Sequence, residues 1–487
     1  MKKHLKLYLI ILLIFLLSLS SCNKTEDKIN GEIKEPLNNV GEEPSTSNTE
    51  NDIAILASED NIDEENLILL VEELTSEKYA GRLAGTEGNE LATQFIANKF
   101  KEIGLESPQG IDNYLQDFNI NCLTFDEAPI MQLEDKDGNV IKSFKFAEDF
   151  VIRQYTAAKN LDIKAPLYLV KGSETVSTAN SNAKDKILLF PLSRKTNPTL
   201  YIDATSSLAG IVEDDIESAS RYYSKLPVAP LFNDSFDSQY NEPLLFVDKD
   251  TFTELKEAAE QELILHIIFN FTVDRDKKVS NVIGVIPGSD PVLKDEYIII
   301  GAHFDHVGDN KNGTYNPGAL DNASGTASLL EIARVIKSSN ITPKKTIIFI
   351  AFNGEENGLV GSEYYANNPI YPLDKAVMIN LDMVGSSSDI ALTIASVNNV
   401  KTKLLNDIIE CAQELNINYI PSNDGGSDHQ SFSRVGVDAI LLINADLLSG
   451  YHSYDDTVED VDKFKMEQIV KLVLHYIDKT TNTIEKE

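Results

Sequence analysis

The chain is short of basic residues relative to acidic ones. Among its 487 residues, 43 are lysine or arginine and 77 are aspartate or glutamate, which gives a formal net charge of −34. Binding to nucleic-acid phosphates requires a basic face, so this deficit argues against a nucleic-acid partner. An acidic balance favours solubility and does not identify a substrate by itself.

Cysteine is also scarce, with three in the whole chain. Two isolated thiols remain once the N-terminal Cys22 is set aside, and two do not make a disulfide framework. We expect Cys122 and Cys411 to be buried and free. No internal repeat is visible.

Residues 1–22 have the features of an export signal. Lysines precede an apolar run over residues 7–19, which is shorter than the ~20 residues of a membrane span. The run ends in LSSC, which resembles a bacterial lipobox and implies a lipid anchor at Cys22. We therefore expect a cell-surface protein held on the outer face of the bacterial membrane. Residues 23–60 are polar and should form a disordered tether.

The remaining chain divides into three parts that differ in their hydrophobic patterns. Residues 61–122 contain two helical patterns, and the second is expected to stop at Gly104. Residues 123–275 alternate short β-like runs with polar loops, which predicts an inserted strand-rich domain. In residues 276–483, apolar runs such as KKTIIFIAF alternate with helical stretches. This alternation predicts an α/β fold, with a mixed, largely parallel central sheet and helices on both faces.

Several ionisable residues follow the predicted strands or precede helices of this last part. They are His303, Asp321, Glu355, Glu356, Asp382 and His452. In open α/β sheets, ligands bind beyond the carboxyl ends of the strands, so we expect these side chains to converge at one edge.

Each of these residues also has a plain structural reading. A histidine after a strand is often satisfied within the fold, and an aspartate before a helix is often a cap. Taken together, however, two histidines and three carboxylates are a plausible ligand set for two divalent ions. Imidazole and carboxylate suit zinc, and two ions ~3.5–4 Å apart support hydrolysis.

Six motifs occur along the chain in the order GAHFDH, GALDNASG, NGEENGLVGS, NLDMVG, SDHQSF and YHSYDDT. Together they resemble the zinc aminopeptidases of the M28 peptidase family, and so does the earlier segment YAGRLAGTEGNE. The resemblance covers roughly residues 60–122 and 276–480. Over the inserted region, DKILLFPL and AGIVEDD resemble a protease-associated domain, whose motifs are looser.

The family resemblance implies two Zn²⁺ ions with five ligands. Asp321 would bridge the two ions. His303 and Asp382 would complete one site, and Glu356 and His452 would complete the other.

The same resemblance implies roles for neighbouring residues. Glu355 would act as general base on a metal-bridging water. Asp305 would accept the imidazole N–H of His303 and orient the ring. Tyr451 would hydrogen-bond the developing oxyanion.

The direction of cleavage follows from charge. A carboxypeptidase needs cations for the terminal carboxylate of its substrate. Near the motifs of residues 276–483, we find Arg334 and Arg434, and a solvated surface position suits each. A site rich in carboxylates attracts an α-ammonium group instead. The expected activity is an aminopeptidase acting on peptides with a free N-terminus.

Two other functions remain open. A glutaminyl cyclase shares this fold and uses one zinc, and a non-catalytic surface-binding protein would use the same scaffold without metal ligands. The adjacent glutamates Glu355 and Glu356 and the full ligand set favour the peptidase. His306 and His429 also lie in the motifs, but the family pattern places neither on a metal.

Overall fold

The computed structural model describes residues 61–152, 160–172, 174–175, 181–192, 198–214, 243–339, 342–397, 402–423, 425–444 and 450–482. The expected export signal, the lipid anchor at Cys22 and the tether lie outside these residues. Within the described ranges, no helix combines the length and the apolar character that crossing a bilayer requires.

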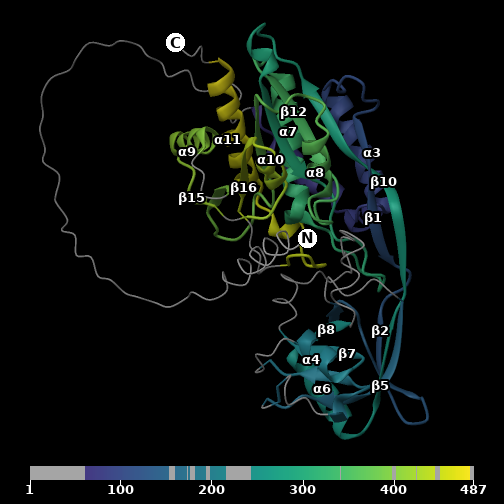
Figure 1. The fold of residues 1–487 in the computed structure, drawn as a ribbon. Helices are drawn as coiled ribbons and strands as arrows, with labels where there is room; N and C mark the ends of the chain where they lie inside the picture. The colour runs from purple at the N-terminus through teal and green to yellow at the C-terminus, as the bar shows by residue number, and fades with distance from the viewer. Residues whose placement is uncertain are drawn as a thin grey trace, which may run out of the picture. The chain divides into compact units, whose positions relative to one another are not determined.

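An eight-stranded mixed sheet carries the α/β part of the chain (Figure 1). Its strand order is β1-β10-β12-β11-β13-β16-β14-β15. The four central strands β12, β11, β13 and β16 run parallel, while β10 and β14 pair antiparallel on either side of them. The expected mixed, largely parallel sheet is thus confirmed. The strand bounds are β1 Leu115–Phe125, β10 Phe271–Ile286, β11 Tyr297–His303, β12 Thr346–Phe352, β13 Ala376–Leu381, β14 Leu392–Ser396, β15 Tyr419–Ser422 and β16 Asp438–Ile443.

Helices cover both faces of this sheet because its central strands are apolar on both sides. In β11, Ile298 and Ile300 join one core, whereas Ile299 joins the core on the opposite face. The first core includes α2 Glu64–Leu74, α3 Glu87–Ile103, α7 Ser324–Ser338, α9 Lys403–Glu414 and α11 Lys463–Asn482. The second includes α8 Val360–Asn367 and α10 His429–Arg434. Such burial on both sides explains the continuous apolar runs in the sequence.

The two N-terminal helices begin and end at the expected signals. The side chain of Asp63 accepts a hydrogen bond from the Asn66 amide and caps α2, and Thr86 caps α3 in the same way. Helix α3 ends at Gly104, whose φ of 86° is left-handed and suits a residue without a side chain.

The inserted region forms a second eight-stranded sheet in the order β3-β2-β9-β5-β6-β7-β8-β4. Its elements are β2 Ile130–Glu134, β3 Val140–Phe144, β4 Phe150–Ile152, β5 Leu161–Leu169, β6 Ile187–Phe190, α4 Pro198–Thr205, β7 Ala209–Glu213, β8 Leu244–Val247, α6 Lys249–Glu260 and β9 Ile264–Phe269. The boundaries expected at residues 123 and 275 fall inside β1 and β10, which pair with each other over most of their length.

The two expected free thiols are confirmed. Cys122 lies in β1 and Cys411 in α9, and both are buried and unpaired with one another. Burial raises the pKa of these thiols to about 11 and about 12. Neither is therefore a reactive thiolate at neutral pH.

Candidate metal centre

The carboxyl ends of three parallel strands deliver the predicted residues to one edge of the sheet. His303 is the last residue of β11, and Asp382 directly follows β13. Glu355 and Glu356 lie in the turn between β12 and α8. Asp321 lies in the short helical turn Ala319–Ala323, directly before α7.

Asp321 lies between two histidines. Its Oδ1 is 3.3 Å from Nε2 of His303, and its Oδ2 is 3.2 Å from Nε2 of His452. The two oxygens of one carboxylate thus face two different imidazole rings. One carboxylate thus has a separate oxygen available on each side.

Each histidine also faces a second carboxylate. Nε2 of His303 is 3.3 Å from Oδ1 of Asp382, and Nε2 of His452 is 3.0 Å from Oε2 of Glu356. The five residues expected as ligands therefore form two groups that share Asp321.

The chemistry of this centre fits zinc. His452 is buried, and its Nε2 makes no hydrogen bond, although two carboxylate oxygens lie within 3.2 Å. A buried nitrogen that faces oxygens without bonding them is suited to share a cation with them. Imidazole nitrogens and carboxylate oxygens are also ordinary zinc ligands.

The adjacent glutamates differ in their electrostatic surroundings. Burial raises the pKa of Glu355 well above its usual value, and the charges of Glu356 and Asp382 add to this effect although His303 opposes it. Burial also acts on Glu356, but the charge of His452 and the hydrogen bond with His306 outweigh it and lower its pKa to about 2. Glu356 therefore stays ionised as a ligand would, while Glu355 has the proton affinity of a base.

Asp305 orients the site differently from the expectation. Nδ1 of His303 lies 3.2 Å from the backbone carbonyl oxygen of Asp305, whereas the nearer oxygen of its carboxylate is 3.8 Å away. That carboxylate instead accepts the backbone N–H groups of Glu355 at 3.1 Å and Glu356 at 3.2 Å. Because two amides compete for its oxygens, the carboxylate positions the glutamates and leaves the ring to the carbonyl.

The remaining predicted residues occupy distinct positions. Tyr451 stacks on the ring of His452, with centroids 3.8 Å apart and planes 20° apart. Burial and the surrounding carboxylates raise the pKa of its hydroxyl well above the usual value, so it remains a donor. His429 is buried at the start of α10, where burial lowers its pKa to about 4. His306 lies at the centre, beside Glu356.

The most extensive contact that sequence reasoning missed comes from Arg82. Its guanidinium is fully buried and donates to the carbonyl oxygens of Phe304, Leu74, Pro317 and Gly318 at 2.6–2.9 Å. Burial lowers its pKa to about 10, so it stays charged at neutral pH. This residue ties the N-terminal segment to the loops that carry Asp305 and Asp321. It lies in the YAGR part of the N-terminal motif, which was the available signal.

Two further residues hold the ligands in place. The carboxylate of Asp456 accepts the backbone N–H groups of Leu320 at 2.7 Å and Asp321 at 3.0 Å. The hydroxyl of Ser427 donates to Oδ2 of Asp382 at 2.6 Å. Asp456 lies in YHSYDDT and Ser427 lies in SDHQSF, but local sequence does not reveal which groups they contact.

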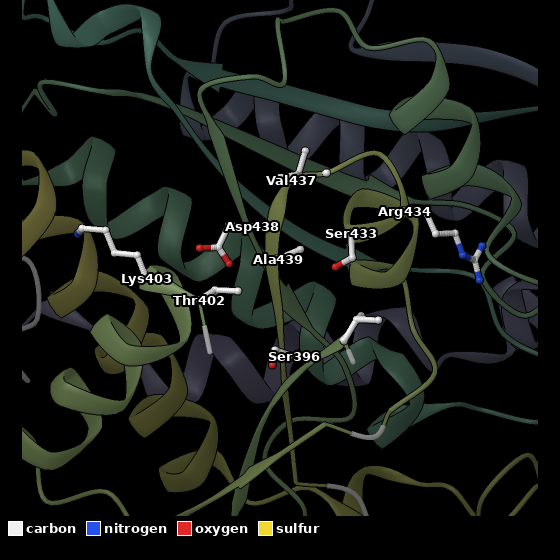
Figure 2. Close-up of a pocket in the computed structure, with 10 residues that line it drawn as sticks. Ser396, Thr402, Lys403, Ser433, Arg434, Val437, Asp438 and Ala439 are labelled. Atoms are coloured by element: carbon white, nitrogen blue, oxygen red, sulfur yellow. The ribbon is translucent and has the colours of Figure 1, made fainter. Parts of the chain in front are cut away.

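The hollow shown in Figure 2 lies at the opposite edge of the sheet, where β16 begins. Its volume is about 370 Å³. Asp438 accepts the backbone N–H of Leu404 at 3.0 Å, and Arg434 is exposed and donates to Gln430 at 3.2 Å. The charged groups there act as caps and surface contacts, so this hollow is separate from the metal centre.

Comparisons with known proteins agree with a zinc-binding centre in this chain. Residues 281–477 match Peptidase family M28. Aminopeptidase YwaD of Bacillus subtilis (strain 168) is 26% identical over 431 residues, which are 85% of each protein. A probable zinc metalloprotease of Pyrenophora tritici-repentis is 41% identical over 113 residues, 22% of this chain and 25% of that protein.

Solved structures show the same fold. The zinc aminopeptidase BSAP from Bacillus subtilis aligns with a TM-score of 0.62 and 22% identity, over 88% of this chain and 97% of that one. An aminopeptidase from Aneurinibacillus sp. strain AM-1 aligns with a TM-score of 0.60 and 22% identity, over 87% and 95%.

An α/β sheet with histidines and carboxylates gathered at its carboxyl edge fits a metal-dependent hydrolase. The family match over the strands that carry these residues makes the assignment specific. Over residues 281–477 the chain matches peptidase family M28, and it is a zinc metallopeptidase.

Proposed function

We propose that the chain is a di-zinc aminopeptidase that removes N-terminal residues from peptides. The observation that carries this proposal is the shared carboxylate of Asp321, whose two oxygens face His303 and His452. Asp382 would complete the site of His303, and Glu356 would complete the site of His452. Two zinc ions held there would supply the Lewis acidity that activates a water and stabilises the oxyanion.

The other residues of the centre then have defined tasks. Glu355 accepts the proton of the attacking water and passes it to the leaving amine, which its raised proton affinity favours. The ring of Tyr451 stacks on that of His452, and its hydroxyl, a protonated donor, would stabilise a developing oxyanion. Asp305 keeps Glu355 and Glu356 in register through their backbone amides.

The positions of three arginines support cleavage from the N-terminus. Arg334 donates to Glu331 and to the carbonyl of Asn61, and Arg434 lies beside the hollow at the other edge. Arg82 uses its donors on backbone carbonyls. None of these three is placed to hold a substrate carboxylate. The carboxylates Glu355 and Asp382 instead attract an α-ammonium group. Similar proteins described as aminopeptidases support the same direction.

A matched pair of peptides tests this direction. The two peptides share a sequence, and one is acetylated at its N-terminus. The free peptide should lose its first residue, while the acetylated peptide should remain intact. Equal cleavage of both, or release of C-terminal residues first, would overturn the proposal. Glu355→Gln serves as the control, because it separates this activity from that of a contaminating peptidase.

We also propose that the mature enzyme is anchored by lipid at Cys22 on the outer face of the bacterial membrane. The support is the lysine-rich start, the apolar run and the LSSC sequence. Wild-type protein should fractionate with membranes, and a Cys22→Ala variant should not. Membrane association of the variant would contradict the anchor.

A further inference from the structure

His306 lies at the metal centre without belonging to the proposed ligand set. Its side chain is fully buried, and its ring packs directly over Gly318. A Cβ atom on Gly318 would lie 2.5 Å from the ring carbons, so a glycine is needed there. The ring also meets that of His452 edge to face, with centroids 5.6 Å apart. Packing on these sides fixes where the two nitrogens point.

One of those nitrogens contacts Glu356. Nδ1 of His306 lies 3.0 Å from Oε1 of Glu356 in hydrogen-bond geometry. An ionised carboxylate only accepts hydrogen bonds, so the proton of this contact belongs to Nδ1. The other ring nitrogen, Nε2, is buried and has no hydrogen-bond partner.

The two oxygens of Glu356 therefore have different surroundings. Oε1 faces the N–H of His306, while Oε2 lies 3.0 Å from Nε2 of His452, which makes no hydrogen bond. A carboxylate on a flexible side chain can present either oxygen or both. A hydrogen bond to Oε1 selects Oε2 as the oxygen that faces the metal.

We propose that His306 is a positioning residue that donates Nδ1–H to Oε1 of Glu356 and thereby directs Oε2 toward the ion shared with His452. This inference rests on the two-ion site proposed above. It concerns one of the two ions, because the ligands of the other, His303 and Asp382, are not hydrogen-bonded by His306. Partners that orient metal ligands typically change metal affinity 10–100-fold when removed.

Direct ligation is the competing role. His306 forms a group with Asp321 and Glu356 in which one ligand atom of each residue lies within 4.8 Å of the others. However, Nδ1 is 3.8 Å from Oδ2 of Asp321 and makes a well-oriented hydrogen bond to Glu356. A nitrogen that carries a proton has no lone pair for a metal, so the hydrogen bond and ligation exclude each other.

Three substitutions separate these roles. In His306→Asn, the side-chain amide places an N–H near the position of Nδ1. In His306→Gln, the amide N–H lies near the position of Nε2 instead. His306→Leu fills much of the space and has no donor. A donor role thus predicts that the asparagine variant resembles wild type, while the glutamine and leucine variants do not.

The experiment titrates metal-free protein with Zn²⁺ against a chromophoric chelator and resolves two dissociation constants. His306→Leu and His306→Gln should weaken one site at least about tenfold and leave the other within about twofold, whereas His306→Asn should keep both within about threefold. His475→Asn is the matched control, because it removes the histidine of the remote group formed with Cys411 and Glu414 and so reveals metal bound there. Near-UV circular dichroism of each metal-free variant establishes that it is folded.

Two results would overturn the inference. One is equal weakening in the asparagine and leucine variants, which indicates ligation or packing. The other is unchanged affinity in a folded leucine variant. Failure of the proposed function is distinguishable, since it appears in the wild-type titration itself as fewer than two zinc ions per chain.

Discussion

Among the residues that the structure describes, each of the two sheets contains a cluster of histidine and carboxylate, and the two clusters differ in how their charges are balanced. In the inserted sheet, Nδ1 of His266 lies 2.7 Å from Glu134, and Nε2 lies 2.7 Å from Asp162. The ammonium group of Lys164 also contacts Glu134. Both ring nitrogens are thus hydrogen-bonded, and the ammonium group of Lys164 offsets the charge of Glu134.

At the carboxyl edge of the other sheet, carboxylates outnumber the cations beside them. The acidic residues gathered there are Asp305, Asp321, Glu355, Glu356, Asp382, Asp428 and Asp456, and Arg82 supplies a guanidinium. Buried charge of one sign is costly unless it is paired or coordinates a metal. Residue types alone therefore do not distinguish a metal site from an ion-pair network. The excess of buried carboxylates and the unbonded Nε2 of His452 between two of them set the carboxyl edge apart from the inserted cluster.

The largest expected effect comes from removing the proposed base at the carboxyl edge of the first sheet, which we call the metal edge. Glu355→Gln keeps the shape of the side chain but cannot accept a proton. We expect kcat to fall at least ~10²-fold while both zinc ions are retained. Steady-state kinetics and elemental analysis on the same preparation check this, and loss of metal together with activity would mean that Glu355 is a ligand.

Replacing Arg82 measures how much its buried guanidinium contributes to the stability of the fold around the metal edge. Arg82→Met leaves four backbone carbonyls without their donors, so we expect a loss of about 3 kcal/mol in the free energy of unfolding. The exposed Arg434→Met should change it by less than about 0.5 kcal/mol. Urea denaturation of both variants measures the difference, and similar values would contradict the anchoring role of Arg82.

Substituting one glutamate in each cluster compares the two clusters directly. Glu356→Gln should weaken one zinc site at least about tenfold, because it removes a ligand charge. Glu134→Gln changes a glutamate of the other cluster and should leave zinc binding unaltered. A fall in zinc affinity in the Glu134 variant would contradict the claim that the two clusters differ in metal binding.

The pH dependence of zinc binding is the smallest expected effect. Burial opposes the charged form of His452, but the charges of Glu356 and Asp321 outweigh it and raise its pKa to about 10 from the ordinary 6.5. In the metal-free protein, this proton stabilises the fold below pH 6.5, and that contribution is lost as the pH rises toward 10. Zinc must displace the proton, so its affinity should rise up to about tenfold per pH unit over this window.

Competition titrations at pH 7 and pH 8 measure that rise in zinc affinity, and an affinity that does not increase would contradict it.

In the inserted cluster, the stability that comes from ionisation has the opposite pH dependence. The hydrogen bond from Lys164 is the main cause that lowers the pKa of Glu134 to about 2. Its contribution to stability is therefore present above pH 4.5 and is lost as the pH falls toward 2.

The fold of the metal edge could be predicted from the sequence because buried strands appear as continuous apolar runs. The runs EYIIIGA and TIIFIAF are apolar on both faces, and the residues that follow them converge where parallel strands end. The adjacent pair Glu355 and Glu356 was recognisable for the same reason. The helix stop at Gly104 was also visible, since a left-handed residue favours glycine.

Contacts between distant segments were beyond that reasoning. Arg82 bonds carbonyls more than 220 residues away, and no local pattern announces this. The carbonyl of Asp305, and not its carboxylate, receives the ring of His303, because two backbone amides occupy the carboxylate. Side-chain types predict which groups can bond, but only the folded backbone decides which ones meet.

Counting zinc in the purified, zinc-loaded wild-type protein tests the central claim most directly. Elemental analysis, with protein concentration from quantitative amino-acid analysis, gives the number of ions per chain. The arrangement of Asp321 between His303 and His452 predicts about two, and removal of both by a chelator should abolish peptide hydrolysis until zinc is restored. One zinc ion or none per active chain would contradict the two-ion account.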